Sequence, residues 1–286
     1  MKSRVTLLAL AGTGALWLAG YGAHAQQAGA NTPAQSVFVG YSANPEDILA
    51  PARVGYSSAD GSAGAQLHFG VLYQPPPFKA AAIQWEPFVG VTVADEPARK
   101  LDRKELRLGA RALVPFGYAD MSFVTAADRR TGAGKDGARI DVTILPENAG
   151  GIWRRAQQLG VFIRPRIGSY VDRQRHTDDP VAAPDGRATG VWAGIDIDYA
   201  PLVIPRSTFG YRNRFLRDVS VSGARLRERH RLHAFHYTHL FYDPNEAPEP
   251  GKPRLSLTIE RAIGSDPIEG SRERHATTGI YLGFQL

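Results

Sequence analysis

The side chains best suited to acid–base chemistry lie in two neighbouring segments. His236 is followed two residues later by Thr238, and Glu260 belongs to the next alternating segment of the chain. Residues i and i+2 of a β-strand share a face, and a hairpin around 243–253 would place His236 opposite Glu260. A hydroxyl, an imidazole base and a carboxylate that orients the base are the parts of an esterase site. The main interpretation of the sequence assigns no catalytic residue, and these three residues form the candidate catalytic set of the alternative, an esterase.

Three histidines at a spacing of three residues raise the question of a metal site. On a helix His233, His236 and His239 would converge, but the Tyr, Thr and Phe residues around them favour a strand. On a strand His236 faces away from the other two, and these lie about 20 Å apart at roughly 3.3 Å per residue. The sequence therefore predicts no metal site, and no cofactor motif is found.

Arginines alternate along the segment 225–231. A strand there would place four of them on one face: Arg225, Arg227, Arg229 and Arg231. Such a stripe could bind anionic lipopolysaccharide or an acidic ligand, or it could be a strand end that protrudes into water. The net charge of +6 and the lack of interleaved stacking aromatics predict that the chain does not bind nucleic acid.

Alternation of apolar and charged residues is the main structural signal. Leu106, Leu108 and Ala110 alternate with Glu105, Arg107 and Arg111, which separates an apolar face from a charged one on a strand. Similar segments recur along the chain, with weaker candidates that include 203–211 and 215–227. If the strands form a barrel, the charged faces are predicted to line its lumen. The candidate lumen residues are Glu86, Glu105, Arg107, Arg111, Asp141, Arg164, Arg166, Asp196, Asp198 and Glu260.

Composition limits the classes of protein that fit. The chain has 286 residues and no cysteine, which excludes disulfides and thiolate metal sites. Its mean hydropathy of −0.26 excludes a bundle of transmembrane helices. Residues 1–25 have the features of a secretory signal peptide: positive charge at Lys2 and Arg4, an apolar run of about 16 residues, and the small-x-small site Ala23-His24-Ala25.

The last segment carries the most specific pattern. In 279–286, Ile280, Leu282, Phe284 and Leu286 lie on one face up to the final residue. This resembles the terminal strand of Gram-negative outer-membrane β-barrel proteins, which the barrel-assembly machinery recognises. Members of that group usually end in Phe, whereas this chain ends in Leu286. The resemblance covers general architecture and implies an apolar outer face turned to lipid and lipopolysaccharide.

The resemblance and the alternation predict an all-β fold. We expect a closed antiparallel transmembrane barrel of about 12 strands, with 10 or 14 as alternatives, formed by residues 26–286 as one domain. One helix is expected near 149–159. Aromatic residues near strand ends suit a girdle at the membrane interface: Trp85, Tyr118, Trp192, Tyr199, Tyr211, Phe241 and Tyr242.

Three functions fit these patterns. The first is a narrow channel for small polar or charged solutes, or an envelope structural protein if ion pairs fill the lumen. The second is an esterase that modifies lipid or lipopolysaccharide. Outer-membrane phospholipase A and the lipid A 3-O-deacylase use a His-x-Ser pair, and the nearest match here is His236-Tyr-Thr238. The third is a soluble periplasmic binding barrel. The sequence leaves the oligomeric state open.

Overall fold

The computed structural model describes residues 36–42, 45, 51–81, 83–97, 101–175, 177–180, 184–201, 203–243, 254–265 and 274–285. The expected signal peptide at 1–25 lies outside these residues. The described chain forms one antiparallel sheet with the strands β1 (Ser36–Gly40), β2 (Ala52–Ala59), β3 (Ser62–Gln74), β4 (Phe78–Ala80), β5 (Ile83–Glu96), β6 (Leu101–Val114), β7 (Gly117–Asp128), β8 (Gly134–Ile144), β9 (Val161–Arg175), β10 (Gly186–Tyr199), β11 (Ser207–Gly223), β12 (Arg229–Leu240), β13 (Arg254–Gly264) and β14 (His275–Gln285).

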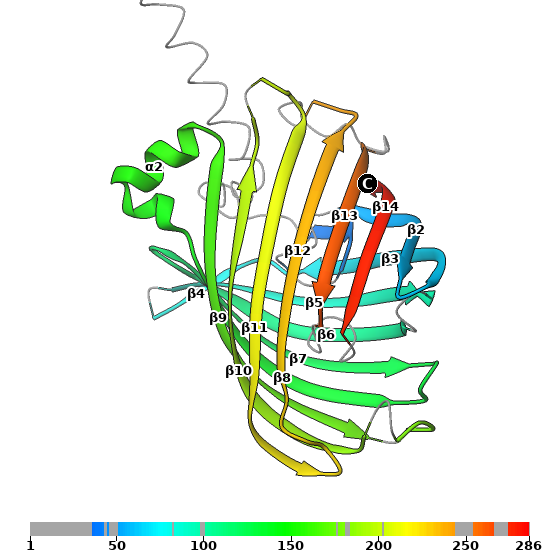
Figure 1. Cartoon of the computed structure of the whole chain (residues 1–286). Helices are drawn as coiled ribbons and strands as arrows, with labels where there is room; N and C mark the ends of the chain where they lie inside the picture. Colours follow the sequence, from blue (N-terminus) through cyan, green and yellow to red (C-terminus); the bar gives the residue numbers. More distant parts are fainter. Residues whose placement is uncertain are drawn as a thin grey trace, which may run out of the picture.

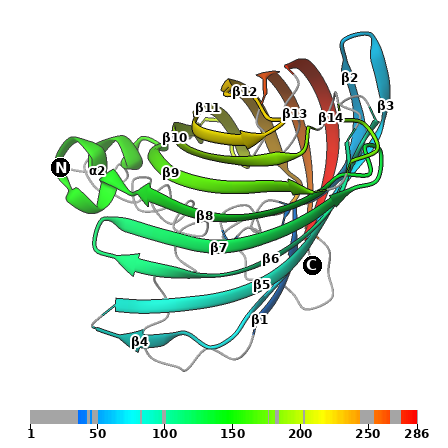
Figure 2. The ribbon, with the colours of Figure 1, turned by 90° about the horizontal axis from the view of Figure 1, so that it is seen from below.

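The sheet closes on itself. Each long strand pairs with the next one along the chain, and β14 pairs with β2 from Phe284 opposite Ala52 to Thr277 opposite Ala59. Figures 1 and 2 show β14 beside β2 and β3 at the closing seam. Twelve strands form the ring, while β1 pairs with part of β3 and β4 with the start of β5. The prediction of a closed antiparallel barrel of about 12 strands is confirmed.

One expectation about the elements is wrong and another is confirmed. The segments 203–211 and 215–227 are not separate strands, because the single strand β11 runs through Ser207–Gly223. The expected helix is present as α2 (Gly151–Gln158), preceded by the 3₁₀ turn η2 (Pro146–Ala149). Both helices lie in the connection between β8 and β9, at the outer edge of one barrel end (Figures 1 and 2).

No helix in the described part of the chain is long and apolar enough to cross a membrane.

The two faces of the wall have opposite chemistry. On the outer face Leu108 is 58% exposed and Phe123 69%, whereas on the inner face Arg107 is 5% exposed and Arg139 3%. A water-soluble protein buries apolar side chains and exposes charged ones, and large continuous apolar surfaces face a partner or a membrane. Closure also gives each of the twelve ring strands that the structure describes a partner strand on both sides, which reduces the unpaired backbone that hydrocarbon would penalise. The fold therefore has the general architecture of outer-membrane β-barrel proteins, as the C-terminal pattern implied.

Glycines let large inner side chains lie flat against the wall. Trp192 in β10, Gly168 in β9 and Asp141 in β8 are register neighbours in one row. The indole Nε1 of Trp192 passes over Gly168 and donates to the Asp141 carboxylate at 2.8 Å. A Cβ on Gly168 would lie 2.2 Å from that Nε1. Only glycine leaves room for this bond.

The same arrangement occurs twice more. The Tyr170 hydroxyl passes over Gly190 and donates to Asp218 at 2.6 Å. The His236 ring passes over Gly210 toward Asp198, with 3.6 Å between Nε2 and Oδ1. Each row joins a ring to an aspartate two strands away. The contact therefore links three adjacent strands on the inner face of the barrel.

We predict that Gly168→Ala destabilises the barrel by about 2 kcal/mol, because the new methyl group displaces Trp192 and leaves a buried hydrogen bond unmade. The measurement is urea unfolding of the barrel refolded into lipid vesicles. Gly134→Ala is the matched control, since its Cβ would meet only a carbonyl oxygen at 3.4 Å. Equal stability of the two variants would contradict the proposed row.

Candidate functional site

The inner wall is the candidate site, because it gathers most of the charged side chains named in the sequence analysis. The structure places all of the predicted lumen residues on inner-facing positions of the wall: Glu86 in β5, Glu105, Arg107 and Arg111 in β6, Asp141 in β8, Arg164 and Arg166 in β9, Asp196 and Asp198 in β10, and Glu260 in β13. Their contacts divide the wall into two arcs that differ in packing.

The first, the closed arc, runs over β6 to β9 and is tightly paired. Arg111 donates two hydrogen bonds to Asp120, at 2.8 and 2.9 Å, and its guanidinium lies 3.9 Å from the centre of the Tyr118 ring. Arg103 and Arg107 both pair with Glu105. The side chains of Arg111 and Asp120 are only 9% and 6% exposed. Buried charges held in this way fill space and resist solvent entry.

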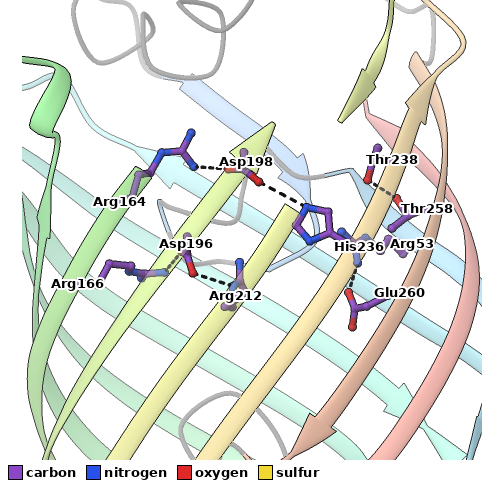
Figure 3. A network of polar contacts seen from close by, with 10 residues as sticks. All are labelled: Arg53, Arg164, Arg166, Asp196, Asp198, Arg212, His236, Thr238, Thr258 and Glu260. Carbon is purple, nitrogen blue, oxygen red and sulfur yellow. Dashed lines mark hydrogen bonds and ion pairs between the residues drawn. The ribbon is translucent and has the colours of Figure 1, made fainter. Parts of the chain in front are cut away.

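The second, the open arc, runs over β9 to β13 and on to β2 (Figure 3). Arg164 donates to Asp198 and Arg166 to Asp196, each at 3.1 Å, and Arg212 lies 3.4 Å from Asp196. Arg164 and Arg212 retain 29% and 30% side-chain exposure. The open arc is therefore more accessible to solvent than the closed arc.

The open arc ends at the seam of the barrel. Arg53 in β2 donates to Glu260 in β13 at 3.2 Å, across the intervening strand β14. The Arg53 guanidinium also lies 5.6 Å from the centre of the Tyr281 ring. A cation from the first barrel strand thus pairs with an anion from the penultimate strand.

Two predicted girdle aromatics face inward instead. Trp192 is buried on the inner wall, with the guanidinium groups of Arg166 and Arg214 at 5.3 and 5.5 Å from its ring. Tyr118 lies against Arg111. Both suit cation–π contacts that fix arginines in place. The assignment of these two residues to the girdle was wrong, because strand parity points them to the lumen.

The outer face does carry an aromatic cluster. Tyr211 packs on Phe235 with ring centres 4.7 Å apart, and Phe209 packs on Tyr237 at 5.1 Å. Tyr199 and Phe241 are exposed at the ends of β10 and β12. Trp85 has the outer-facing parity of β5, and Tyr242 lies 4.8 Å from the Arg254 guanidinium.

The candidate catalytic set lies on adjacent strands but is engaged in other contacts. Glu260 stands opposite His236 in the strand register, and its carboxylate pairs with Arg53. The His236 ring is directed to Asp198, and the Thr238 hydroxyl is 3.0 Å from that of Thr258. Figure 3 shows these contacts together. The nucleophile and the base of the candidate set are therefore each directed to a residue outside the set.

The neighbouring histidines face the outside of the barrel. His233 Nδ1 is 2.8 Å from the Tyr211 hydroxyl, and His239 Nδ1 is 3.0 Å from that of Ser207. His236 points inward between them, as expected for a strand. Within the residues that the structure describes, no three His, Asp or Glu side chains gather as metal ligands do.

The alternation predicted that the four arginines of 225–231 share one strand face. This prediction is wrong. The strand β12 begins only at Arg229, so Arg225 and Arg227 lie in the preceding turn. Arg225 is buried, with Nη1 3.5 Å from the Asp172 carbonyl oxygen. Arg229 and Arg231 are exposed on the outer face, and His230 between them is buried and has the inward parity of the strand.

Sequence reasoning missed several members of the inner wall. Arg53, Arg212 and Arg214 complete the open arc, and Asp120 and Arg139 belong to the closed arc. Strand parity could have found most of them, because each has the parity of an inward neighbour. Their pairing partners lie on other strands, and parity alone does not predict those.

No protein-family model matches the chain, and no curated protein sequence does. Among solved structures, the chain is similar to the NanC porin at 9% identity, with a TM-score of 0.44 over 82% of this chain and 100% of that one. The KdgM porin, in complex with disordered oligogalacturonate, has 10% identity and a TM-score of 0.40 over 82% and 98%. The translocator domain of the autotransporter NalP from Neisseria meningitidis has 10% identity and a TM-score of 0.37 over 96% of each chain.

We predict that Arg111→Met costs about 3–5 kcal/mol of unfolding free energy, because it leaves the buried Asp120 carboxylate without its cation. The double variant Arg111→Met with Asp120→Leu should recover much of the loss. Urea unfolding in vesicles measures both.

The exposed pair Arg130–Asp95, at 3.0 Å and with side chains 34% and 49% exposed, supplies the control. Arg130→Met should cost about 0–1 kcal/mol. A loss for Arg111→Met no larger than the loss for Arg130→Met would show that the closed arc does not stabilise the wall.

Proposed function

We propose that this protein is a narrow channel of the outer membrane of a Gram-negative bacterium, for small polar or charged solutes. The observation that carries the proposal is the open arc, a row of partly exposed charged side chains along the inside of a wall whose outer face is apolar. A charged, water-accessible interior supplies the groups that replace the hydration of a passing ion or polar solute.

The two arcs explain why the channel would be narrow. Twelve strands lie between small barrels that their own side chains fill and wide porins with an aqueous channel. The closed arc fills its side of the interior with buried ion pairs. Solutes would then pass along the open arc, between cations such as Arg164 and Arg212 and anions such as Asp198 and Glu260.

The proposal includes the route to the membrane. Residues 1–25 would direct export and be cleaved, and the C-terminal strand would be recognised by the barrel-assembly machinery. Ile280 and Leu282 in β14 support this part, because their side chains are exposed on the outer face. The surrounding partners would be outer-membrane lipid and lipopolysaccharide.

The other functions fit the geometry less well. A soluble binding barrel would leave its exposed apolar outer face in water. An esterase needs a nucleophile within reach of its base, whereas Thr238 contacts Thr258 and His236 is directed to Asp198. A structural role without conduction is the alternative that the next experiment separates from a channel.

We predict that the purified barrel conducts ions in a planar lipid bilayer. Changing both Arg164→Gln and Arg212→Gln should shift the reversal potential in a salt gradient toward cation preference, because Asp196 and Asp198 would then dominate the open arc. The control is Lys104→Gln on the outer face of β6, which should leave selectivity unchanged.

A barrel that shows no conductance at any voltage would reject the channel and leave the structural role. Conductance with unchanged selectivity in the double variant would show that solutes do not pass along the open arc.

A further inference from the structure

A pocket of about 510 Å³ lies at the barrel end where β12 begins and β13 ends. It is separate from the open arc, because Arg229 and Arg231 are on outer-facing positions of β12. The lining residues are Glu228, Arg229, His230, Arg231, His233, Ile263, Gly264, Ser265 and Arg274. The volume is in the range of small-ligand sites.

The pocket contains an excess of positive charge. Arg229, Arg231 and Arg274 are exposed, and no ion pair links them to any other residue that the structure describes. The one carboxylate in the lining, that of Glu228, lies 3.0 Å from His230 Nε2. Guanidinium groups gathered in this way match the oxygens of a phosphate.

The strand register places a fourth cation beside the pocket, outside its lining. Arg217 in β11 stands directly opposite Arg229 in β12. Like charges directly opposite one another destabilise a sheet, and this pair has no carboxylate partner among the described residues. A bound anion would relieve this repulsion.

The surroundings of the pocket indicate what carries the anion. Arg231 stands opposite Phe215, which is exposed on the outer face. Phe235 and Ile259 are exposed farther along the outer face, toward the middle of the barrel, with the exposed Arg261 opposite Phe235. A ligand that fits both parts has an anionic head and an apolar tail.

We infer that this pocket binds the phosphate headgroup of a membrane lipid, with the acyl chains lying along Phe235 and Ile259. The inference rests on the outer wall facing lipid, which the proposed function also requires. It assigns to Arg217, Arg229, Arg231 and Arg274 a role outside the lumen.

The test is native mass spectrometry of the full barrel released from a neutral detergent, titrated with phosphatidic acid, with phosphatidylcholine or with inorganic phosphate. The wild-type barrel should retain phosphatidic acid in preference to phosphatidylcholine. The double variant Arg229→Gln with Arg231→Gln should bind phosphatidic acid with an affinity at least about tenfold lower, because charge-assisted hydrogen bonds are lost. Inorganic phosphate alone should not displace the lipid.

The matched control is Arg173→Gln with Arg187→Gln. These two arginines are also exposed and directly opposite each other on the outer face, in β9 and β10, but they do not line the pocket. Their replacement should leave phosphatidic acid binding unchanged.

An equal loss of phosphatidic acid binding in the two double variants would overturn the proposed pocket. It would indicate diffuse electrostatic attraction between the barrel and the lipid. Displacement by inorganic phosphate would overturn the lipid as the ligand. Because the readout is bound mass and not conductance, failure of the channel proposal would leave this result interpretable.

Discussion

The structure depends on one constraint: a wall with lipid on one side must pair its own charges on the other. Closure satisfies the backbone, since β14 joins β2 and no long strand edge remains free. It also forces the charged parity of every strand into a common interior. There each arginine is stabilised only if a carboxylate or an aromatic ring meets it. The ion pairs of both arcs follow from this requirement.

The recurring rows of ring, glycine and aspartate show how the wall meets the requirement without a solid core. Trp192, Tyr170 and His236 each cross a glycine on the neighbouring strand to reach an aspartate on the strand beyond. The side chains lie along the wall and do not point across the lumen. Such packing stabilises the order of the strands.

The sequence predicted those parts of the structure that depend on local periodicity. Period two in 105–114 correctly separated the face of Leu106 from that of Arg107. The chain length, at about 10 residues per spanning strand, predicted about 12 strands. Trp192 has the same parity as Asp196 and Asp198, so its inward position was also readable, although it was assigned to the girdle.

Contacts between strands could not be read in this way. The pairing of Arg53 with Glu260 depends on closure between chain ends 207 positions apart. The break in the 225–231 stripe depends on where the turn before β12 ends, and alternation continues through turn and strand alike. The pocket likewise forms only when the start of β12, the end of β13 and Arg274, which precedes β14, lie at the same barrel end.

The most direct test of the inverted wall uses the fact that the chain has no cysteine. Single variants Leu108→Cys and Ile259→Cys on the outer face, and Arg212→Cys on the inner face, would each carry a small fluorophore in vesicles. The structure predicts that spin-labelled lipid quenches the two outer probes and aqueous iodide quenches the inner one. Quenching of the outer probes by iodide and not by lipid would contradict the account.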